Sequence, residues 1–140
     1  MFDSRIIVAG SRGYFNTPRF DATVKHYVEN VHEGLVVAFI SGMARTGADR
    51  LIYEYCKVHG HRCFEFPARW DVHGLRAGYI RNTEMGDEAT HLLAFWDGES
   101  KGTASMIRYA ARLGLVVHIA EISARSAEKH LHYQRYELGA

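Results

Sequence analysis

The predicted fold depends first on one stretch of the chain, Val36-Val37-Ala38-Phe39-Ile40-Ser41-Gly42-Met43-Ala44-Arg45-Thr46-Gly47-Ala48-Asp49. Its apolar first part is typical of a buried strand, and the residues that follow it to position 59 place apolar side chains at helical spacing. Between the two lies a loop of small residues that opens directly onto the expected helix. A strand, a glycine-bearing loop and a helix in this order indicate a parallel α/β sheet.

Two further loops occur in the same context. Gly10-Ser11-Arg12-Gly13 follows the apolar run at 6–9, and Asp97-Gly98-Glu99-Ser100-Lys101-Gly102-Thr103 follows the apolar run at 92–96. In an open parallel sheet such loops gather at the carboxyl edge. Backbone N–H groups and helix N-termini are free there to hold an anion. The three loops together therefore predict a site for a phosphate-bearing ligand.

Apolar runs and amphipathic patterns alternate along the whole chain. The expected strands cover residues 5–10, 35–40, 62–66, 91–95 and 115–119, and the expected helices cover 17–32, 48–59, 75–86, 101–113 and 123–136. Thr17 supplies a capping hydroxyl for the first helix, and Pro18 is at its first helical position. This order predicts an α/β fold whose mostly parallel sheet of about five strands carries helices on both faces. We expect one domain over 1–120 and a C-terminal helix in 121–140 packed on it.

Composition narrows the classes of protein. The 140 residues are 47% hydrophobic and 24% charged, which is ordinary for a soluble globular domain. The net charge of +1 does not favour nucleic-acid binding, which usually needs a strong basic bias. No secretory signal is visible, and no apolar run approaches the roughly 20 residues that span a membrane, so we expect a cytoplasmic protein. Cys56 and Cys63 form no motif, and the histidine pairs 59/61 and 130/132 lack partners at ligand spacing, so no metal site is predicted.

Arg12 is the residue of the first loop that indicates ligand binding. Its guanidinium offers a fork of donors that can grip a phosphate beside Gly10 and Ser11. The loop does not match the dinucleotide fingerprint, which needs a third glycine and opens its helix directly. A purely structural glycine turn remains the alternative.

The second loop is the strongest local signal. Ser41 and Gly42 leave the strand and Gly47 opens the helix, so a ligand can approach the backbone and the positive end of the helix dipole. Asp49 either accepts hydrogen bonds from a ribose hydroxyl or simply complements that dipole. No Gly-Lys-Ser/Thr follows at the spacing of a Walker A motif.

The third loop follows the same logic. The backbone amides of Gly102 and Thr103, with the Thr103 hydroxyl, would form an anion nest beside Lys101. Asp97 and Gly98, at the start of the loop, are further candidate ligand contacts. The alternative is an ordinary capping turn.

Residues 68–82 bring three arginines, a histidine and a tryptophan together. Arg81, next to Asn82 on the expected helix, can reach over the edge of the sheet, and Glu84 is expected on the same helix face. Trp70 either stacks on a base or anchors its loop against the core. His73 is interpreted as a loop residue rather than a catalyst.

Several motifs together resemble a known family. They are Arg5–Gly10 with Ser11-Arg12, Ser41-Gly42-x-Ala44-Arg45-x-Gly47-Ala48-Asp49, Phe66-Pro67-Ala68-x-Trp70, Ala77-Gly78-x-Ile80-Arg81-Asn82-x-x-Met85 and Gly102-Thr103-Ala104-x-Met106. In this order they resemble the YspA-like branch of the SLOG superfamily, which also contains the Smf/DprA and Lonely Guy proteins. The resemblance covers most of the chain. It implies a three-layer Rossmann-like sandwich that binds nucleotides or their derivatives, homodimers, and an origin in bacteria or phages.

The resemblance to Lonely Guy enzymes also implies roles for single residues. Those enzymes hold the nucleotide phosphate on a glycine-threonine loop, here Gly102-Thr103, and use an arginine that Arg81 matches in placement. Their catalytic glutamate lies three residues after the threonine, where this chain has Met106. Glu99-Ser100-Lys101 replaces their double glycine, and Thr46 is an extra residue in the second loop. These departures disfavour phosphoribohydrolase activity and leave phosphate binding as an expectation.

Two functions therefore follow from the sequence. The first is binding of a nucleotide or nucleotide-derived ligand at the carboxyl edge, as a sensor or sequestering protein, with no other cofactor. Its expected contacts are Gly10, Ser11, Arg12, Ser41, Gly42, Gly47, Asp49, Trp70, Arg81, Asn82, Asp97, Gly98, Lys101, Gly102 and Thr103. The alternative is an N-glycosidase that cleaves a nucleoside monophosphate into base and sugar phosphate, with Arg81, Asp97 and Glu84 as catalytic residues. DNA handling, by analogy with DprA, is a third interpretation that the near-neutral charge disfavours.

Overall fold

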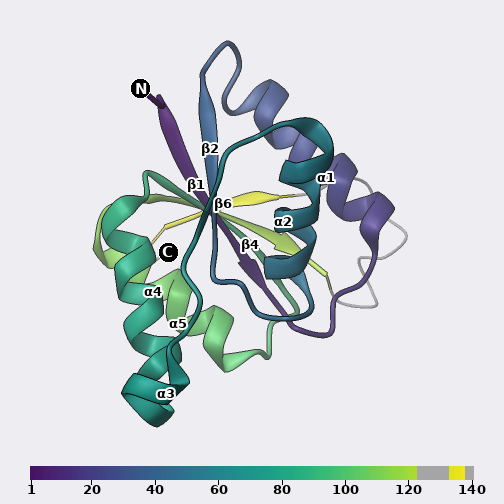
Figure 1. Cartoon of the computed structure of the whole chain (residues 1–140). Helices are drawn as coiled ribbons and strands as arrows, with labels where there is room; N and C mark the ends of the chain where they lie inside the picture. Colours follow the sequence, from purple (N-terminus) through teal and green to yellow (C-terminus); the bar gives the residue numbers. More distant parts are fainter. Residues whose placement is uncertain (123–132, 138–140) are drawn as a thin grey trace.

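The fold is a twisted sheet with helices on both faces. The computed structural model describes residues 1–122 and 133–137. In this part of the chain six strands form one sheet in the order β3-β2-β1-β4-β5-β6. Figure 1 labels β1, β2, β4 and β6 of this sheet. The strands are β1 (Ser4–Gly10), β2 (Val37–Ser41), β3 (Cys63–Glu65), β4 (His91–Trp96), β5 (Val116–Glu121) and β6 (Gln134–Tyr136). The pairs from β3 to β5 are parallel, and β6 runs antiparallel to β5.

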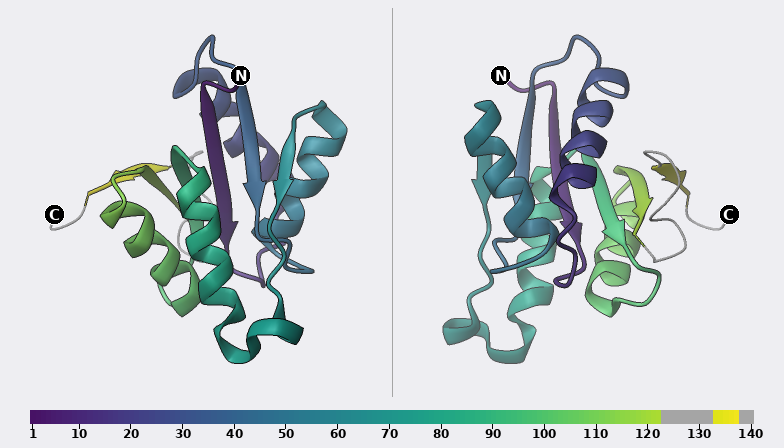
Figure 2. Two further views of the ribbon diagram at one scale, coloured as in Figure 1. Left: turned by 60° about the vertical axis from the view of Figure 1, so that its left-hand side comes forward. Right: turned by 90° about the vertical axis from the view of Figure 1, so that its right-hand side faces the viewer.

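The helices divide into two layers. Their bounds are α1 (Thr17–Asn30), α2 (Ala48–His59), α3 (Trp70–His73), the 3₁₀ turn η1 (Gly74–Arg76), α4 (Ala77–Glu88) and α5 (Lys101–Arg112). The views in Figure 2 place α1 and α2 on one face of the sheet and α4 and α5 on the other. Each face has its own apolar core. One is built around Phe20, Phe39 and Phe95, and the other around Ile40, Leu92 and Met106.

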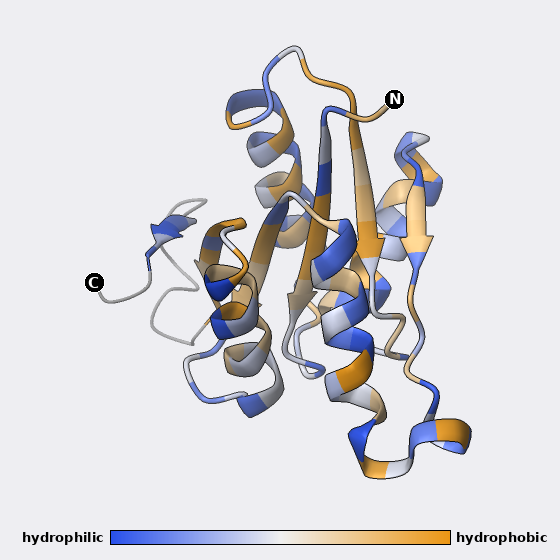
Figure 3. Ribbon diagram, turned by 90° about the vertical axis from the view of Figure 1, so that its left-hand side faces the viewer, coloured by the Kyte–Doolittle hydropathy of each residue, from blue (hydrophilic) through white to orange (hydrophobic). Residues whose placement is uncertain are grey.

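Amphipathic patterning accounts for this layering. Figure 3 shows apolar residues concentrated in the strands and hydrophilic residues on the outer turns of the helices. The central strand β1 buries Ile6, Ile7 and Val8 completely, since helices cover both of its faces. The expected α/β class, the three layers and the mostly parallel sheet are thus confirmed.

Some local expectations need correction. The first helix is capped by Asn16, whose side chain accepts a hydrogen bond from the Arg19 amide, and not by Thr17, which already lies inside the helix. The expected helix at 75–86 corresponds to α4, which begins at Ala77 and ends at Glu88, and the separate short elements α3 and η1 precede it. The expected final helix at 123–136 falls mostly outside the described residues. Its last part, Gln134–Tyr136, is wrong as a helix because it pairs with β5 as a strand.

The sheet reverses its winding direction between β1 and β4. The chain passes from β1 to β2 and β3 on one side, and from β4 to β5 on the other. The loops after β1 and β4 therefore diverge at the carboxyl edge and leave a crevice, the usual ligand position in open α/β sheets. The predicted anion site is expected at this switch point.

Gly47 holds the second loop against the first. Its φ of +76° with ψ of −154° is a conformation that only glycine adopts readily. A Cβ at this position would also overlap the carbonyl oxygen of Ser11. The residue therefore permits both the turn into α2 and the close approach of the two loops.

At the opposite end of the sheet lies a cluster of one buried and two half-buried histidines. His32, 1% exposed, forms a hydrogen bond through Nδ1 with Ser4 Oγ at 2.9 Å, and its ring lies 4.4 Å from that of His91. His118 Nδ1 forms a hydrogen bond with the hydroxyl of buried Tyr27 at 2.9 Å. Burial, reinforced by neighbouring charges, lowers the pKa of His32 and of His118 to about 4. The cluster is a neutral part of the core at pH 7.

Candidate functional site

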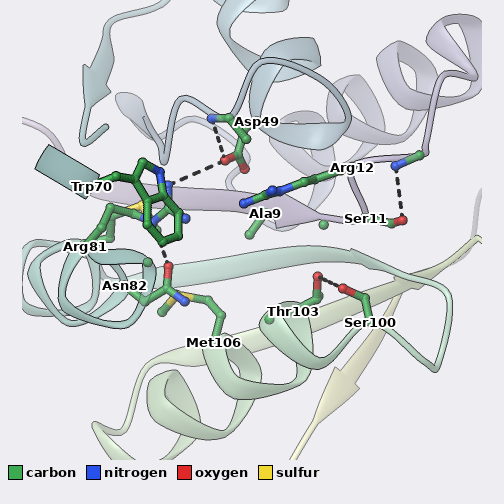
Figure 4. Close-up of a pocket in the computed structure, with 16 residues that line it drawn as sticks. Ala9, Ser11, Arg12, Asp49, Trp70, Arg81, Asn82, Ser100, Thr103 and Met106 are labelled. Atoms are coloured by element: carbon green, nitrogen blue, oxygen red, sulfur yellow. Dashed lines mark hydrogen bonds and ion pairs between the residues drawn. The ribbon is translucent and has the colours of Figure 1, made fainter. Parts of the chain in front are cut away.

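A hollow of about 490 Å³ lies at the switch point between β1 and β4. We call it the edge hollow, and Figure 4 shows the side chains around it. It is lined by Ala9, Gly10, Ser11, Arg12, Gly13, Ala44, Asp49, Trp70, Gly78, Arg81, Asn82, Met85, Ser100, Gly102, Thr103 and Met106. These residues come from the end of β1, the three loops, the first turn of α2, the start of α3, one face of α4 and the first half of α5. The loops predicted to converge do so here.

The first loop presents Arg12 to this space from a short, fixed turn. The Ser11 amide donates to the carbonyl of Phe95 at 3.2 Å, and the Tyr14 amide donates to the carbonyl of Ser11 at 3.3 Å. The Tyr14 ring is buried and stacks on Phe95 at 5.7 Å. The exposed Arg12 side chain extends toward Asp49 in Figure 4. The loop backbone is thus tied to β4, and the guanidinium remains exposed.

The second loop is organised around Asp49. This carboxylate, 9% exposed, accepts a hydrogen bond from the Ala44 amide at 3.0 Å and lies 3.9 Å from Arg81 Nη1. Buried Ser41 donates through its hydroxyl to the Asp49 carbonyl at 2.9 Å. Asp49 makes no capping hydrogen bond to its own helix, whose N-cap is Gly47. Its carboxylate therefore braces the second loop and pairs with a cation.

Arg81 is fixed from three sides. Nη1 donates to the carbonyl of Gly42, and Nε donates to Asn82 Oδ1 at 2.9 Å. A Cβ on Gly42 would meet the guanidinium, so this position has no room for a side chain. With Asp49 as its third partner, the guanidinium is held at the edge of the hollow and needs no rearrangement to meet a ligand.

The electrostatics of this group follow from burial. Burial raises the pKa of Asp49, while the Ala44 amide, Arg81 and Arg12 oppose that rise. Burial lowers the pKa of Arg81, opposed by Asp49, and the positive charge of Arg12 lowers it further. Two cations thus face one buried carboxylate among the described lining residues. An anion near both guanidinium groups would stabilise their charged forms.

The third loop is held by its own aspartate. Asp97 accepts hydrogen bonds from the amides of Glu99 at 2.9 Å and Ser100 at 2.8 Å, and these bonds lower its pKa. They set up the start of α5, which has no side-chain cap on its first turn. Ser100 Oγ lies 3.3 Å from Thr103 Oγ1, and a Cβ on Gly102 would meet nothing within 4 Å. The first turn of α5 therefore presents open backbone to the hollow.

One face of α4 forms the remaining wall. Gly78, Arg81, Asn82 and Met85 all line the hollow, at the spacing that brings residues to one side of a helix. Trp70, 51% exposed, lies over Gly78, since a Cβ there would approach its ring at 3.5 Å. The indole is thus an accessible flat surface at the mouth of the hollow.

Comparison with known proteins identifies the family of the chain. The family model of the YspA, cpYpsA-related SLOG family matches residues 4–73, half of the chain, which include the first two loops. The chain belongs to this SLOG family.

Other comparisons concern the fold. DNA processing protein A (DprA) from Streptococcus pneumoniae has a similar structure, with a TM-score of 0.67 and 14% identity over 86% of this chain. The chain spans about half, 51%, of that DprA chain, and similarity at this identity concerns the fold alone. No curated protein matches the SLOG chain.

The structure brings together most of the residues predicted for the SLOG site. Those that line the edge hollow are Gly10, Ser11, Arg12, Asp49, Trp70, Arg81, Asn82, Gly102 and Thr103. Ser41 and Gly47 do not line it but shape the second loop, and Gly42 lines a neighbouring hollow.

The other predicted residues lie elsewhere. Glu84, Asp97, Gly98 and Lys101 line neither hollow. Glu84 is exposed on the outer side of α4, and Asp97 is occupied by the amides of its own loop. Of the three residues predicted for catalysis, only Arg81 is placed at the hollow.

Sequence reasoning did not assign Gly78, Met85, Ser100 and Met106 to the lining. Helical spacing from Arg81 back to Gly78 and forward to Met85 was an available signal for two of them.

Two features are absent from residues 1–122 and 133–137, the part of the chain that the structure describes. No three or more His, Cys, Asp or Glu residues lie together there as a metal-binding group. No helix in that part of the chain has the length and apolar character needed to cross a membrane.

Proposed function

We propose that this SLOG protein binds a nucleotide or nucleotide-derived small molecule in the edge hollow, as a sensor or sequestering protein. The observation that carries the proposal is the convergence of Arg12, Arg81 and the uncapped first turn of α5 on one space. Guanidinium groups and helix N-termini are the donors that proteins use most readily for phosphate.

Charge supports an anionic ligand. Arg12 and Arg81 outnumber Asp49, and Asp49 is already engaged by the Ala44 amide. The N-termini of α2 and α5 both lack a side-chain cap and add partial positive charge. A phosphate between these groups gains charge-assisted hydrogen bonds, and of the two arginines only Arg81 already pairs with a carboxylate of the described residues, that of Asp49.

Size and surface support a ligand larger than phosphate. The hollow of about 490 Å³ falls in the range of small-molecule sites, roughly 300–1,000 Å³. Trp70 offers a ring face at its mouth, and Asn82 offers an amide inside it. A base stacked on an indole and a phosphate on the arginines match these two ends of the site.

The test is a binding titration at low salt. Purified protein is titrated with AMP, GMP, CMP and UMP, with the unphosphorylated nucleosides as a comparison, by isothermal calorimetry. We expect a monophosphate to bind at least about ten-fold more tightly than its nucleoside, because charge-assisted hydrogen bonds to phosphate are lost without it. Each mixture is also analysed for released base by chromatography, which detects an N-glycosidase.

Arg12→Ala is the matched probe. Its side chain is exposed, so removing it should weaken monophosphate binding about ten-fold without altering the fold. Arg108→Ala, an exposed arginine of α5 that lines neither hollow, is the control. Equal affinity for nucleoside and monophosphate, or equal effects of the two variants, would refute the proposal. The expected homodimer stays a prediction that light scattering can test.

A further inference from the structure

A second hollow adjoins the edge hollow. Its volume is about 510 Å³, and it lies along the second loop and the segment that leads from β3 to α3. The two hollows share four lining residues, Arg12, Ala44, Trp70 and Arg81. The second hollow begins where the edge hollow ends, with the two arginines between them.

The charge of the second hollow differs from that of the first. Three cations, Arg12, Arg45 and Arg81, line it, and none of its lining residues in the described part of the chain is acidic. Thr46 adds a hydroxyl, and Pro67 a rigid apolar wall. Asp49 lines only the edge hollow and pairs with Arg81, so among the described residues no carboxylate of the second lining set faces Arg12 and Arg45.

The backbone of the second loop is shaped for this space. Met43, which lines the second hollow, has a φ of +57°, the only positive φ among the described non-glycine residues. Its amide donates to Ser41 Oγ at 3.1 Å, which holds the turn. A long side chain in the left-handed region costs free energy, so such outliers gather at functional loops.

We propose that the second hollow binds a second phosphate group of the same ligand, with Arg45 as its specific contact. The ligand class is then a nucleotide whose second phosphate lies beyond the ribose from the first. This inference rests on the proposed function, because it takes the 5′-phosphate to occupy the edge hollow. Arg12 and Arg81, which line both hollows, lie between the two phosphates and reduce their repulsion.

Two chemical sources offer a phosphate in that position. A nucleoside 3′,5′-bisphosphate carries it as a free dianion, and a 5′-phosphorylated dinucleotide carries it as a singly charged diester. Three guanidinium groups, of which only Arg81 pairs with a carboxylate in the described part of the chain, favour the more highly charged group. A nucleoside diphosphate has its second phosphate directly on the first and serves as the comparison of equal phosphate number.

The experiment compares affinities within one base series. Wild-type protein is titrated by calorimetry with the four nucleoside 5′-monophosphates, the diphosphates, the 3′,5′-bisphosphates and the 5′-phosphorylated dinucleotides. For the base that binds, we expect the bisphosphate to bind at least about ten-fold more tightly than the monophosphate, the gain of one charge-assisted contact. The diphosphate should gain less than about three-fold, since its second phosphate stays near the first.

Arg45→Ala tests the assigned contact. Arg45 is exposed, so the variant should fold normally and should reduce the ten-fold advantage of the bisphosphate to less than about three-fold. Arg50→Ala, the next arginine along the chain, pairs with Glu54 and lines neither hollow, so it is the matched control. If Arg45→Ala weakens the binding of monophosphate and bisphosphate by the same factor, the inference is overturned.

The remaining outcomes separate the two proposals. If monophosphates bind and bisphosphates bind no better, the second hollow is not a phosphate site and the proposed function stands. If the dinucleotide gains affinity and the bisphosphate does not, the shared phosphate position is right and the preferred source is wrong. If no member of the series binds, the proposed function itself fails.

Discussion

Acid should destabilise the protein through His32, and the size of this effect can be worked out. The folded protein holds the pKa of His32 at about 4, against 6.5 for a free histidine, mainly because of burial. Between these values the unfolded chain binds more protons than the folded one, so stability is fully present above pH 6.5 and is lost as pH falls toward 4. From pH 7 to pH 4.5 this single group should lower the free energy of unfolding by about 2 kcal/mol.

The assay compares wild-type protein with His32→Asn by urea unfolding, followed by circular dichroism at both pH values. An asparagine amide can still form a hydrogen bond with Ser4 Oγ, but it does not titrate. We expect the loss in free energy of unfolding between pH 7 and pH 4.5 to be smaller in the variant by about 2 kcal/mol, whatever the stability of the variant at pH 7. His73→Asn, at an exposed histidine of α3, should keep the wild-type pH dependence. If wild-type and His32→Asn lose the same free energy on acidification, His32 does not titrate as the burial argument requires.

Three further predictions, made on five substitutions, test the site and the residues that support it. Gly47→Ala should lower the free energy of unfolding by roughly 3 kcal/mol or more, because its Cβ would overlap the first loop. Gly60→Ala has nearly the same φ but open space around it, so it should lower that free energy by about 1 kcal/mol. Equal losses in urea unfolding would contradict the contact between the two loops. Arg81→Ala should lower the free energy of unfolding by about 3 kcal/mol, since it leaves the Asp49 carboxylate buried without its cation. A loss under about 1 kcal/mol in urea unfolding would show that the ion pair does not stabilise the fold. Gly102→Leu should abolish monophosphate binding with little change in melting temperature, whereas Gly102→Ala should retain binding. If calorimetry finds that both variants bind normally, the N-terminus of α5 does not contact the ligand.

Most of the fold could be predicted from local patterns. The order of apolar residues predicts both the burial of β1 on its two faces and the helical spacing in α2. The predicted bounds of α2 agree with the structure to the residue. The prediction is wrong where a neighbouring element of the fold determines the secondary structure of a segment. Gln134–Tyr136 has the polarity of a surface helix, yet it becomes a strand because β5 offers a free edge.

The site was predictable in its loops but not in all of its side chains. Asp97 turns back to the amides of Glu99 and Ser100, a short-range bond that removes it from the hollow. Glu84 points outward because the rotation of α4 is set by burial of Ala77, Met85 and Gly86. Whether a polar side chain faces a ligand or its own loop depends on distances of a few ångströms, which spacing along the chain does not contain.

The sequence by itself determined that strand, glycine-bearing loop and helix follow one another, because hydrophobic periodicity and turn residues act over short range. It therefore determined that Arg12, Asp49 and Thr103 would meet at one edge of a parallel sheet. Only the tertiary structure decided that the Asp49 carboxylate accepts a hydrogen bond from the Ala44 amide and pairs with Arg81. It also decided that Arg12 and Arg81 lie between two hollows. The physical reason is that charge pairing and burial depend on separation in space, and here the partners come from loops and helices far apart in the chain.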